Sequence, residues 1–117
     1  MESFQEVNSL FQVLGNPNRL KLFNILMTGV HCNCELSSQT GMAINLISHH
    51  LKVLQEAGLV KSERGDTDGR WIYYSVNQEK IQAIQVGMKA FFDPERITLR
   101  EPACPPRNQK SEEKRNE

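Results

Sequence analysis

The chain has 117 residues, of which 38% are hydrophobic, and its 14 basic side chains balance its 14 acidic ones. This length predicts one compact domain, and the modest apolar fraction favours a dimer that hides further apolar surface. The absence of an apolar run of about 18 residues predicts that no helix spans a membrane. We expect no membrane partner. The balanced charge excludes a general basic field, so any nucleic-acid binding would depend on individually placed charges and helix N-termini.

The N-terminal third of the chain predicts two helices. Apolar residues at three- and four-residue spacing indicate an amphipathic helix over residues 4–14. Asn16 and Pro17 supply a cap and a first-turn proline for a second helix, which we expect to end at Thr28-Gly29. No basic, apolar leader precedes these helices, and the three cysteines are therefore expected to be reduced thiols in the cytoplasm.

The middle of the chain predicts a helical pair. A short helix is expected over residues 35–39, closed by Thr40-Gly41. A longer helix follows over residues 43–56, and Gly58 ends it with a residue suited to a left-handed backbone. A short helix followed by a turn and a longer helix is the order of a helix-turn-helix.

A hairpin and a last helix follow this pair. Residues 59–64 and 71–76 alternate with a period of two and are rich in β-branched and aromatic side chains, which predicts two strands joined by a loop over 65–69. The aromatic side chains of the second strand are expected in the core: Trp71, Tyr73 and Tyr74. A helix from Gln78 carries an apolar stripe and ends at Asp93-Pro94.

This order of elements predicts a mainly α fold with a small β-hairpin, a winged helix-turn-helix. We assign residues 1–92 to a DNA-binding and dimerisation domain, with the first and last helices as the homodimer surface. Residues 93–117 are rich in proline and charge, and we expect a flexible tail that carries Cys104.

The exposed side of the longer helix offers polar side chains at three- and four-residue spacing. Those expected to contact operator DNA are Asn45, Ser48, His49 and Lys52. Asparagine bonds adenine with two hydrogen bonds, while serine and histidine bond bases or phosphates. Arg64 and Arg70 flank the hairpin tip, where a wing would meet phosphates or the minor groove. His50 is expected to pack against the second helix or the wing instead.

Three sequence blocks resemble the ArsR/SmtB family of metal-sensing repressors. They are Leu14-Gly15-Asn16-Pro17-Asn18-Arg19-Leu20, then Ser48-His49-His50-Leu51-Lys52-Val53-Leu54 with Ala57-Gly58-Leu59-Val60, and Gly69-Arg70-Trp71-Ile72-Tyr73-Tyr74-Ser75. The resemblance implies a homodimer that binds an operator and leaves it when an inducer binds. The family's histidine and carboxylate metal pair on the last helix has no counterpart here, because residues 78–92 contain neither His nor Asp.

The resemblance directs attention to Cys32 and Cys34, which match the family's cysteines at the start of the short helix. Thiolates are the preferred ligands of soft, thiophilic ions, and a nearby helix N-terminus favours the thiolate form. Trivalent arsenic and antimony accept three thiolates. Arsenic-sensing members often have a third cysteine in that helix, but position 37 is Ser37, and the remaining thiol is Cys104. We therefore expect As(III) or Sb(III) at Cys32, Cys34 and Cys104.

Other interpretations of the thiols remain open. Cd(II), Pb(II) or Zn(II) would suit the cysteine pair with His31 as a further ligand, although His31 is more simply an exposed loop residue. A redox switch would bridge Cys104 to Cys32 or Cys34, and all three thiols could be merely small, half-buried side chains.

No catalytic constellation is present, and we expect that the protein is not an enzyme. A phosphate-binding glycine loop and a nucleophile with a matching base are both missing from the sequence. A thiol oxidoreductase would have two residues between its cysteines, whereas one separates Cys32 from Cys34. An intracellular metal buffer without DNA activity remains the alternative from another functional class.

Overall fold

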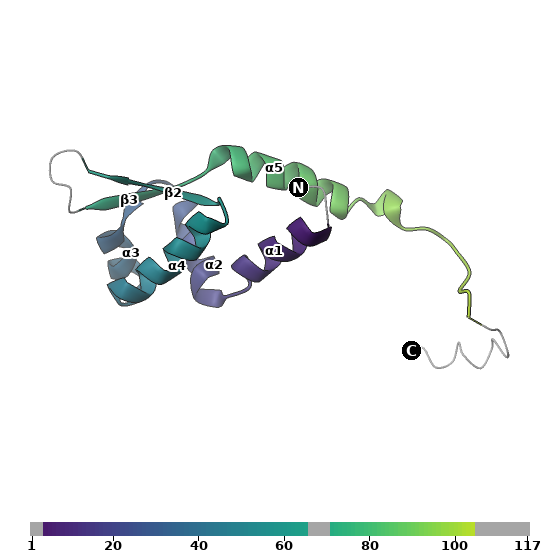
Figure 1. Cartoon of the computed structure of the whole chain (residues 1–117), viewed down its shortest axis with the longest axis horizontal. Helices are drawn as coiled ribbons and strands as arrows, with labels where there is room; N and C mark the ends of the chain where they lie inside the picture. The colour runs from purple at the N-terminus through teal and green to yellow at the C-terminus, as the bar shows by residue number, and fades with distance from the viewer. Residues whose placement is uncertain (1–3, 66–70, 105–117) are drawn as a thin grey trace.

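The computed structural model describes residues 4–65 and 71–104, so the wing tip with Arg70 and the last part of the predicted tail lie outside the described residues (Figure 1). The helices are α1 (Phe4–Leu14), α2 (Pro17–Leu26), α3 (Asn33–Thr40), α4 (Ile44–Glu56), α5 (Gln78–Phe91) and the short 3-10 helix η1 (Pro94–Arg96). The strands are β1 (His31–Cys32), β2 (Val60–Arg64) and β3 (Ile72–Val76). This is the helix-rich, winged arrangement that the sequence predicts.

Local capping explains where the first helices begin and end. The Asn16 side-chain oxygen accepts hydrogen bonds from the backbone N–H groups of Asn18 and Arg19, at 2.9 and 3.1 Å, and so starts α2. Gly41 ends α3 with φ 77°, and Gly58 follows α4 with φ 80°, both in the left-handed region. These two glycines fix the turns on either side of α4.

The sheet contains one strand more than the sequence predicts. Its order is β1-β3-β2, and all neighbours are antiparallel. His31 pairs with Tyr74 and Cys32 with Tyr73, so β1 joins the hairpin at the edge of β3. Two residues are too few to show a period of two, which is why the sequence indicates only the hairpin.

Leucine and isoleucine side chains from α2, α3 and α4 form the core beneath the sheet. The largest fully buried side chains are Leu22, Leu26, Leu36, Ile47, Leu51, Leu54 and Leu59. Tyr74 joins them, as predicted, but Trp71 and Tyr73 are 39% and 41% exposed. The prediction of a core position is wrong for these two aromatics, because successive strand residues face opposite sides and only one face of β3 packs on the core.

The first and last helices run beside each other at the edge of the domain (Figure 1). Large apolar side chains remain exposed on both, including Phe4 and Phe11 on α1 and Val86 on α5. This exposure is what the predicted homodimer surface would cover. Within the described ranges, no helix has the length and apolar character to span a bilayer.

The segment after α5 leads away from the domain (Figure 1). The 3-10 helix η1 is capped by Asp93, whose side chain accepts a hydrogen bond from the Glu95 backbone N–H at 2.9 Å. Arg96 donates to the Phe91 carbonyl, and its guanidinium lies 5.2 Å from the Phe91 ring centroid. Regular structure therefore continues a few residues into the segment expected to be tail, whereas residues 97–104 are exposed and outside any helix or strand.

Candidate nucleic-acid interface and thiol site

One face of α4 presents the polar side chains that the sequence assigns to DNA. Asn45, Ser48, His49 and Lys52 are all exposed, while the opposite face of the helix is buried against the core. The structure thus gathers these four predicted residues on a single surface.

The wing is attached to the far end of the same helix. Gln55 donates a hydrogen bond through Nε2 to the Ser62 hydroxyl at 2.8 Å, which joins α4 to β2. Arg64 is exposed at the end of β2, opposite Ile72 in the sheet register. Arg70, the second predicted wing residue, lies outside the described residues. The helix face and the described part of the wing form one connected unit.

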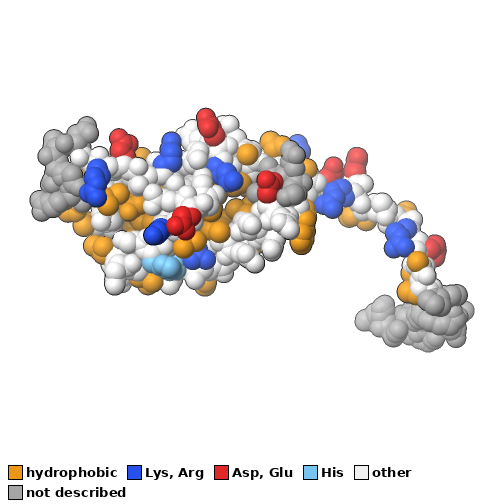
Figure 2. Space-filling view, in the orientation of Figure 1, with side chains coloured by type: hydrophobic (Ala, Val, Ile, Leu, Met, Phe, Trp, Pro, Cys, Tyr) orange, Lys and Arg blue, Asp and Glu red, His pale blue; other side chains and the backbone are white. Residues whose placement is uncertain are grey.

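Charged side chains of both signs are mixed on the face that Figure 2 shows. Figure 2 shows Lys and Arg side chains interspersed with Asp and Glu over the viewed face. This agrees with the equal numbers of basic and acidic residues in the chain. Affinity for a phosphate backbone would therefore come from a few placed cations, such as Lys52, and from helix N-termini.

His50 is a structural residue inside the helix-turn-helix. It is only 5% exposed, and its Nδ1 lies 3.5 Å from Nη1 of Arg19 on α2. Arg19 is held in turn by donation from Nε to the Val13 carbonyl at 2.7 Å. The prediction that His50 packs against the second helix is confirmed. Burial lowers the pKa of His50 below its ordinary value, and the charges of Arg19 and His49 lower this pKa further.

Stability should therefore fall in acid through His50. The folded state keeps this imidazole neutral, whereas the unfolded chain takes up a proton at a pKa of about 6.5. The free energy of unfolding should decrease as pH falls below about 6.5 and level off below the lowered folded-state pKa. A His50→Gln variant should lose this component of the pH slope in urea unfolding, and His49→Gln should keep most of it, because burial and Arg19 are the larger causes of the lowered pKa. An unchanged slope in His50→Gln would contradict this assignment.

Cys32 and Cys34 occupy the joint between the sheet and the helix-turn-helix. Cys32 is the last residue of β1 and the N-cap of α3, and Cys34 lies in the first turn of that helix. Both thiols are free and half-buried. The Cys32 backbone N–H donates to the Glu35 carboxylate at 2.9 Å, as part of a capping box. Sequence analysis missed the role of Glu35, although its place three residues after the cap is typical of a capping box.

His31 lies in β1 and is half-buried rather than in an exposed loop, which corrects its expected placement. Its Nδ1 is 2.8 Å from the Gly29 carbonyl oxygen, which can only accept, so Nδ1 donates. Adjacent strand residues face opposite sides of a sheet, and His31 is therefore directed away from the side chain of Cys32. This arrangement does not favour a single ion shared by His31 and Cys32.

Within one chain the structure does not bring Cys104 to the cysteine pair. Cys104 is exposed on the segment beyond η1, whereas α3 lies at the other end of the domain (Figure 1). Among residues 4–65 and 71–104, no group of three His, Cys, Asp or Glu side chains is arranged to hold a metal ion. The three predicted ligands would have to be assembled by movement of the tail or by a second subunit.

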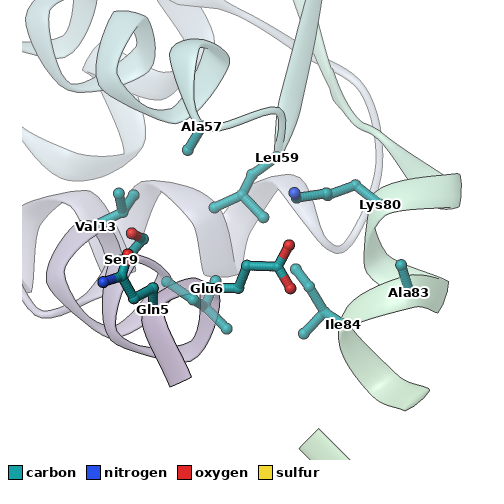
Figure 3. Close-up of a pocket in the computed structure, with 10 residues that line it drawn as sticks. Gln5, Glu6, Ser9, Val13, Ala57, Leu59, Lys80, Ala83 and Ile84 are labelled. Carbon is teal, nitrogen blue, oxygen red and sulfur yellow. The ribbon is translucent and has the colours of Figure 1, made fainter. Parts of the chain in front are cut away.

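A cavity of about 350 Å³ lies between α1 and α5 (Figure 3). Aliphatic side chains such as Val13, Leu59 and Ile84 line it, and Glu6 and Lys80 project into it from the two helices. It contains neither a cysteine nor a histidine and is separate from the thiol pair. The cavity therefore offers no soft ligand and does not contribute to a thiophilic site.

Residues 16–62 match the model of a protein family described as bacterial regulatory protein, arsR family. The arsenical resistance operon repressor of Bacillus subtilis is 29% identical over 84 residues, covering 71% of this chain and 77% of the relative. The cadmium resistance transcriptional regulatory protein CadC of Listeria innocua is 33% identical over 79 residues, covering 64% of this chain and 61% of the relative. Relatives thus include regulators named for different ions.

Solved structures give the same fold. The transcriptional repressor BigR from Xylella fastidiosa superposes with a TM-score of 0.59 at 30% identity, over 75% of this chain and 87% of that one. A homodimeric winged helix-turn-helix DNA-binding domain from Mycobacterium bovis superposes with a TM-score of 0.59 at 24% identity, over 83% and 89%. The predicted fold class is confirmed. The matched family is one of regulatory proteins rather than enzymes, as the sequence predicts.

Proposed function

Given that the chain belongs to the ArsR family of bacterial regulatory proteins, we propose that it is a homodimeric transcriptional repressor released from operator DNA by trivalent arsenic or antimony. Cys32, Cys34 and Cys104 would hold the inducer, in the reducing cytoplasm. The exposed side chains of α4 and Arg64 of the wing would hold the DNA, together with Arg70. The observation that carries the proposal is the position of two free thiols at the joint between β1 and α3.

This joint is well placed to connect ion capture with DNA binding. Cys32 is paired to Tyr73 of β3, and Cys34 belongs to the helix that packs against α4 through the fully buried Leu36. A ligand that draws both sulfurs together would strain the capping box between Cys32 and Glu35 and displace the start of α3. In a dimer that spans two half-sites, such a displacement changes the spacing of the recognition helices and weakens binding.

The third thiolate is what distinguishes a trivalent metalloid from other soft ions. As(III) and Sb(III) complete their coordination with three sulfurs, so the pair needs one more thiol. The chain between Phe92 and Cys104 reaches at most about 40 Å when extended, so the proposed site requires the cysteine pair of the same or of the second subunit to lie within that distance of Phe92. Loop-closure entropy rises only slowly with length and does not forbid this.

Cd(II), Pb(II) and Zn(II) remain the competing inducers. Tetrahedral sites for Zn(II) and Cd(II) can combine sulfur with nitrogen ligands, and His31 is the histidine adjacent to the pair. Because His31 and Cys32 face opposite sides of β1, this ligand set is less favourable than three sulfurs. Because the CadC relative is named for cadmium resistance, Cd(II) is included among the inducers to be tested.

X-ray absorption at the arsenic edge tests the ligand set. Reduced protein loaded with one equivalent of arsenite should show three sulfur neighbours, and Cys104→Ala should show two sulfurs with an oxygen replacing the third. Ser38→Ala, a change on the exposed side of the same helix, should leave the spectrum as in the wild type. Two sulfurs in the wild type, or no change in Cys104→Ala, would remove Cys104 from the site.

A mobility-shift assay on the DNA upstream of the protein's own gene tests the regulatory class. A repressor should form a discrete complex that survives an excess of unrelated DNA. A metal buffer without DNA activity would show only nonspecific binding at low salt. That second result would contradict the proposed function.

A further inference from the structure

We propose that Ile44 and Leu46, in the first turn of α4, contact thymine methyl groups, so that each operator half-site carries A·T pairs where this turn enters the major groove. The proposal rests on the proposed DNA binding by α4 and adds the sequence that α4 selects. It concerns two apolar residues that lie outside the polar set assigned to DNA above.

The first observation is that Ile44 and Leu46 are partly exposed to solvent although both are apolar. Ile44 is 42% exposed and Leu46 is 39% exposed, while Ile47 and Leu51 of the same helix are fully buried. About two fifths of the surface of Ile44 and of Leu46 therefore remains outside the packing beneath α4. Exposed apolar residues are common singly, but these two flank the polar Asn45 in the turn that is proposed to enter the groove.

The second observation is their placement around Asn45. Successive residues of a helix are rotated by about 100°, so Ile44 and Leu46 lie on either side of Asn45 at the beginning of its exposed face. The first residues of a recognition helix are those that contact base edges in the major groove. Ile44 and Leu46 point about 160° apart around the helix axis, so each would border Asn45 on its own side of the helix end that enters the groove.

The chemistry of the groove matches this arrangement. The thymine C5-methyl is the apolar group that base pairs present there, and aliphatic side chains contact it. Asparagine bonds the N6 and N7 edge of adenine. One A·T pair therefore offers an edge for Asn45 and a methyl group for a flanking aliphatic side chain. G·C pairs lack the methyl group and would leave these apolar surfaces against polar base edges.

Electrostatics at this end of α4 also favour DNA over another occupant. The first turn of α4 contains no acidic residue, and Ala43 caps it without a side-chain hydrogen bond. The free backbone N–H groups of this turn can therefore bind phosphate oxygens, because no carboxylate in the same turn repels the phosphates. A protein partner on the same apolar surface is the competing occupant, and the experiment below distinguishes the two.

The test replaces thymine by deoxyuridine, which removes only the methyl group. A duplex is first selected from randomised DNA with the wild-type protein, and each thymine of a half-site is then replaced in turn. Fluorescence anisotropy at fixed salt measures the dissociation constant. At one or two positions, wild-type binding should weaken about fourfold per methyl group removed. Ile44→Ala or Leu46→Ala should bind thymine and uracil duplexes equally at the corresponding position.

Leu99→Ala serves as the matched control, because Leu99 is an exposed leucine far from α4 and should leave uracil sensitivity intact. The inference would be overturned if replacing thymine by uracil left wild-type binding unchanged at every position. It would also be overturned if uracil weakened binding equally in the wild type and in both α4 variants. In both cases specific DNA binding by the wild type would still support the proposed function. Failure to select any sequence would instead contradict the proposed function together with this inference.

Discussion

A Cys32→Ser, Cys34→Ser double variant should bind operator DNA as tightly as the wild type and should remain bound at arsenite concentrations that release the wild type. Allosteric coupling of about 1–3 kcal/mol corresponds to a change of about 5–150-fold in DNA affinity, and all of this change should disappear. The expected loss has a local cause, because the proposed ion would act on the start of α3 through the sulfurs of Cys32 and Cys34. DNA anisotropy with and without arsenite measures the effect.

Serine is a suitable replacement because it keeps the fold of the joint. Serine is among the preferred N-cap residues, so position 32 can still begin α3 and preserve the reciprocal bond from its backbone to Glu35. Ser38→Ala on the exposed side of α3 is the matched control and should respond to arsenite normally. Arsenite-induced release that persists in the double variant would place the inducer elsewhere.

The second large effect is expected at Asn45. Asn45→Ala should weaken binding to the selected operator by about 1–3 kcal/mol, the cost of one bidentate contact with adenine. Binding to unrelated DNA should change little, because this side chain carries no charge. The measurement is a pair of dissociation constants, for selected and for scrambled duplex, at the same salt concentration.

Lys52 provides the contrasting variant on the same face of α4. Lys52→Ala should weaken binding to both duplexes and reduce the slope of log affinity against log salt by about one phosphate contact. Asn24→Ala, on the exposed surface of α2, should alter neither constant. If Asn45→Ala weakened both duplexes equally, Asn45 would position the protein rather than discriminate between bases.

Most of the fold follows from patterns that are local in the sequence. The Asn16-Pro17 cap and the glycines at 41 and 58 mark the ends of α2, α3 and α4, because caps and left-handed turns depend on a few adjacent residues. Long-range pairing is harder to predict. β1 forms only because His31 and Cys32 reach the edge of β3, more than 40 positions further along the chain.

The same distinction separates the two parts of the candidate site. The exposed face of α4 was predictable because a helix with one buried side places Asn45 and Lys52 together on the other. The surroundings of the two thiols could not be predicted, because they depend on β1. Cys32 ends this strand and is the N-cap of α3, and His31 faces the opposite side of the strand. The place of Cys104 depends on the tail and on a second subunit, which no local pattern encodes.

The central claim is that soft-ion capture at Cys32 and Cys34 releases DNA, and one titration tests it most directly. Reduced wild-type protein bound to its selected operator is titrated with As(III), Cd(II) and hydrogen peroxide while DNA anisotropy is followed. The account predicts release by As(III) at about one ion per cysteine pair, weaker release by Cd(II), and no release by peroxide. Protein that binds As(III) and still remains on its operator would contradict the account.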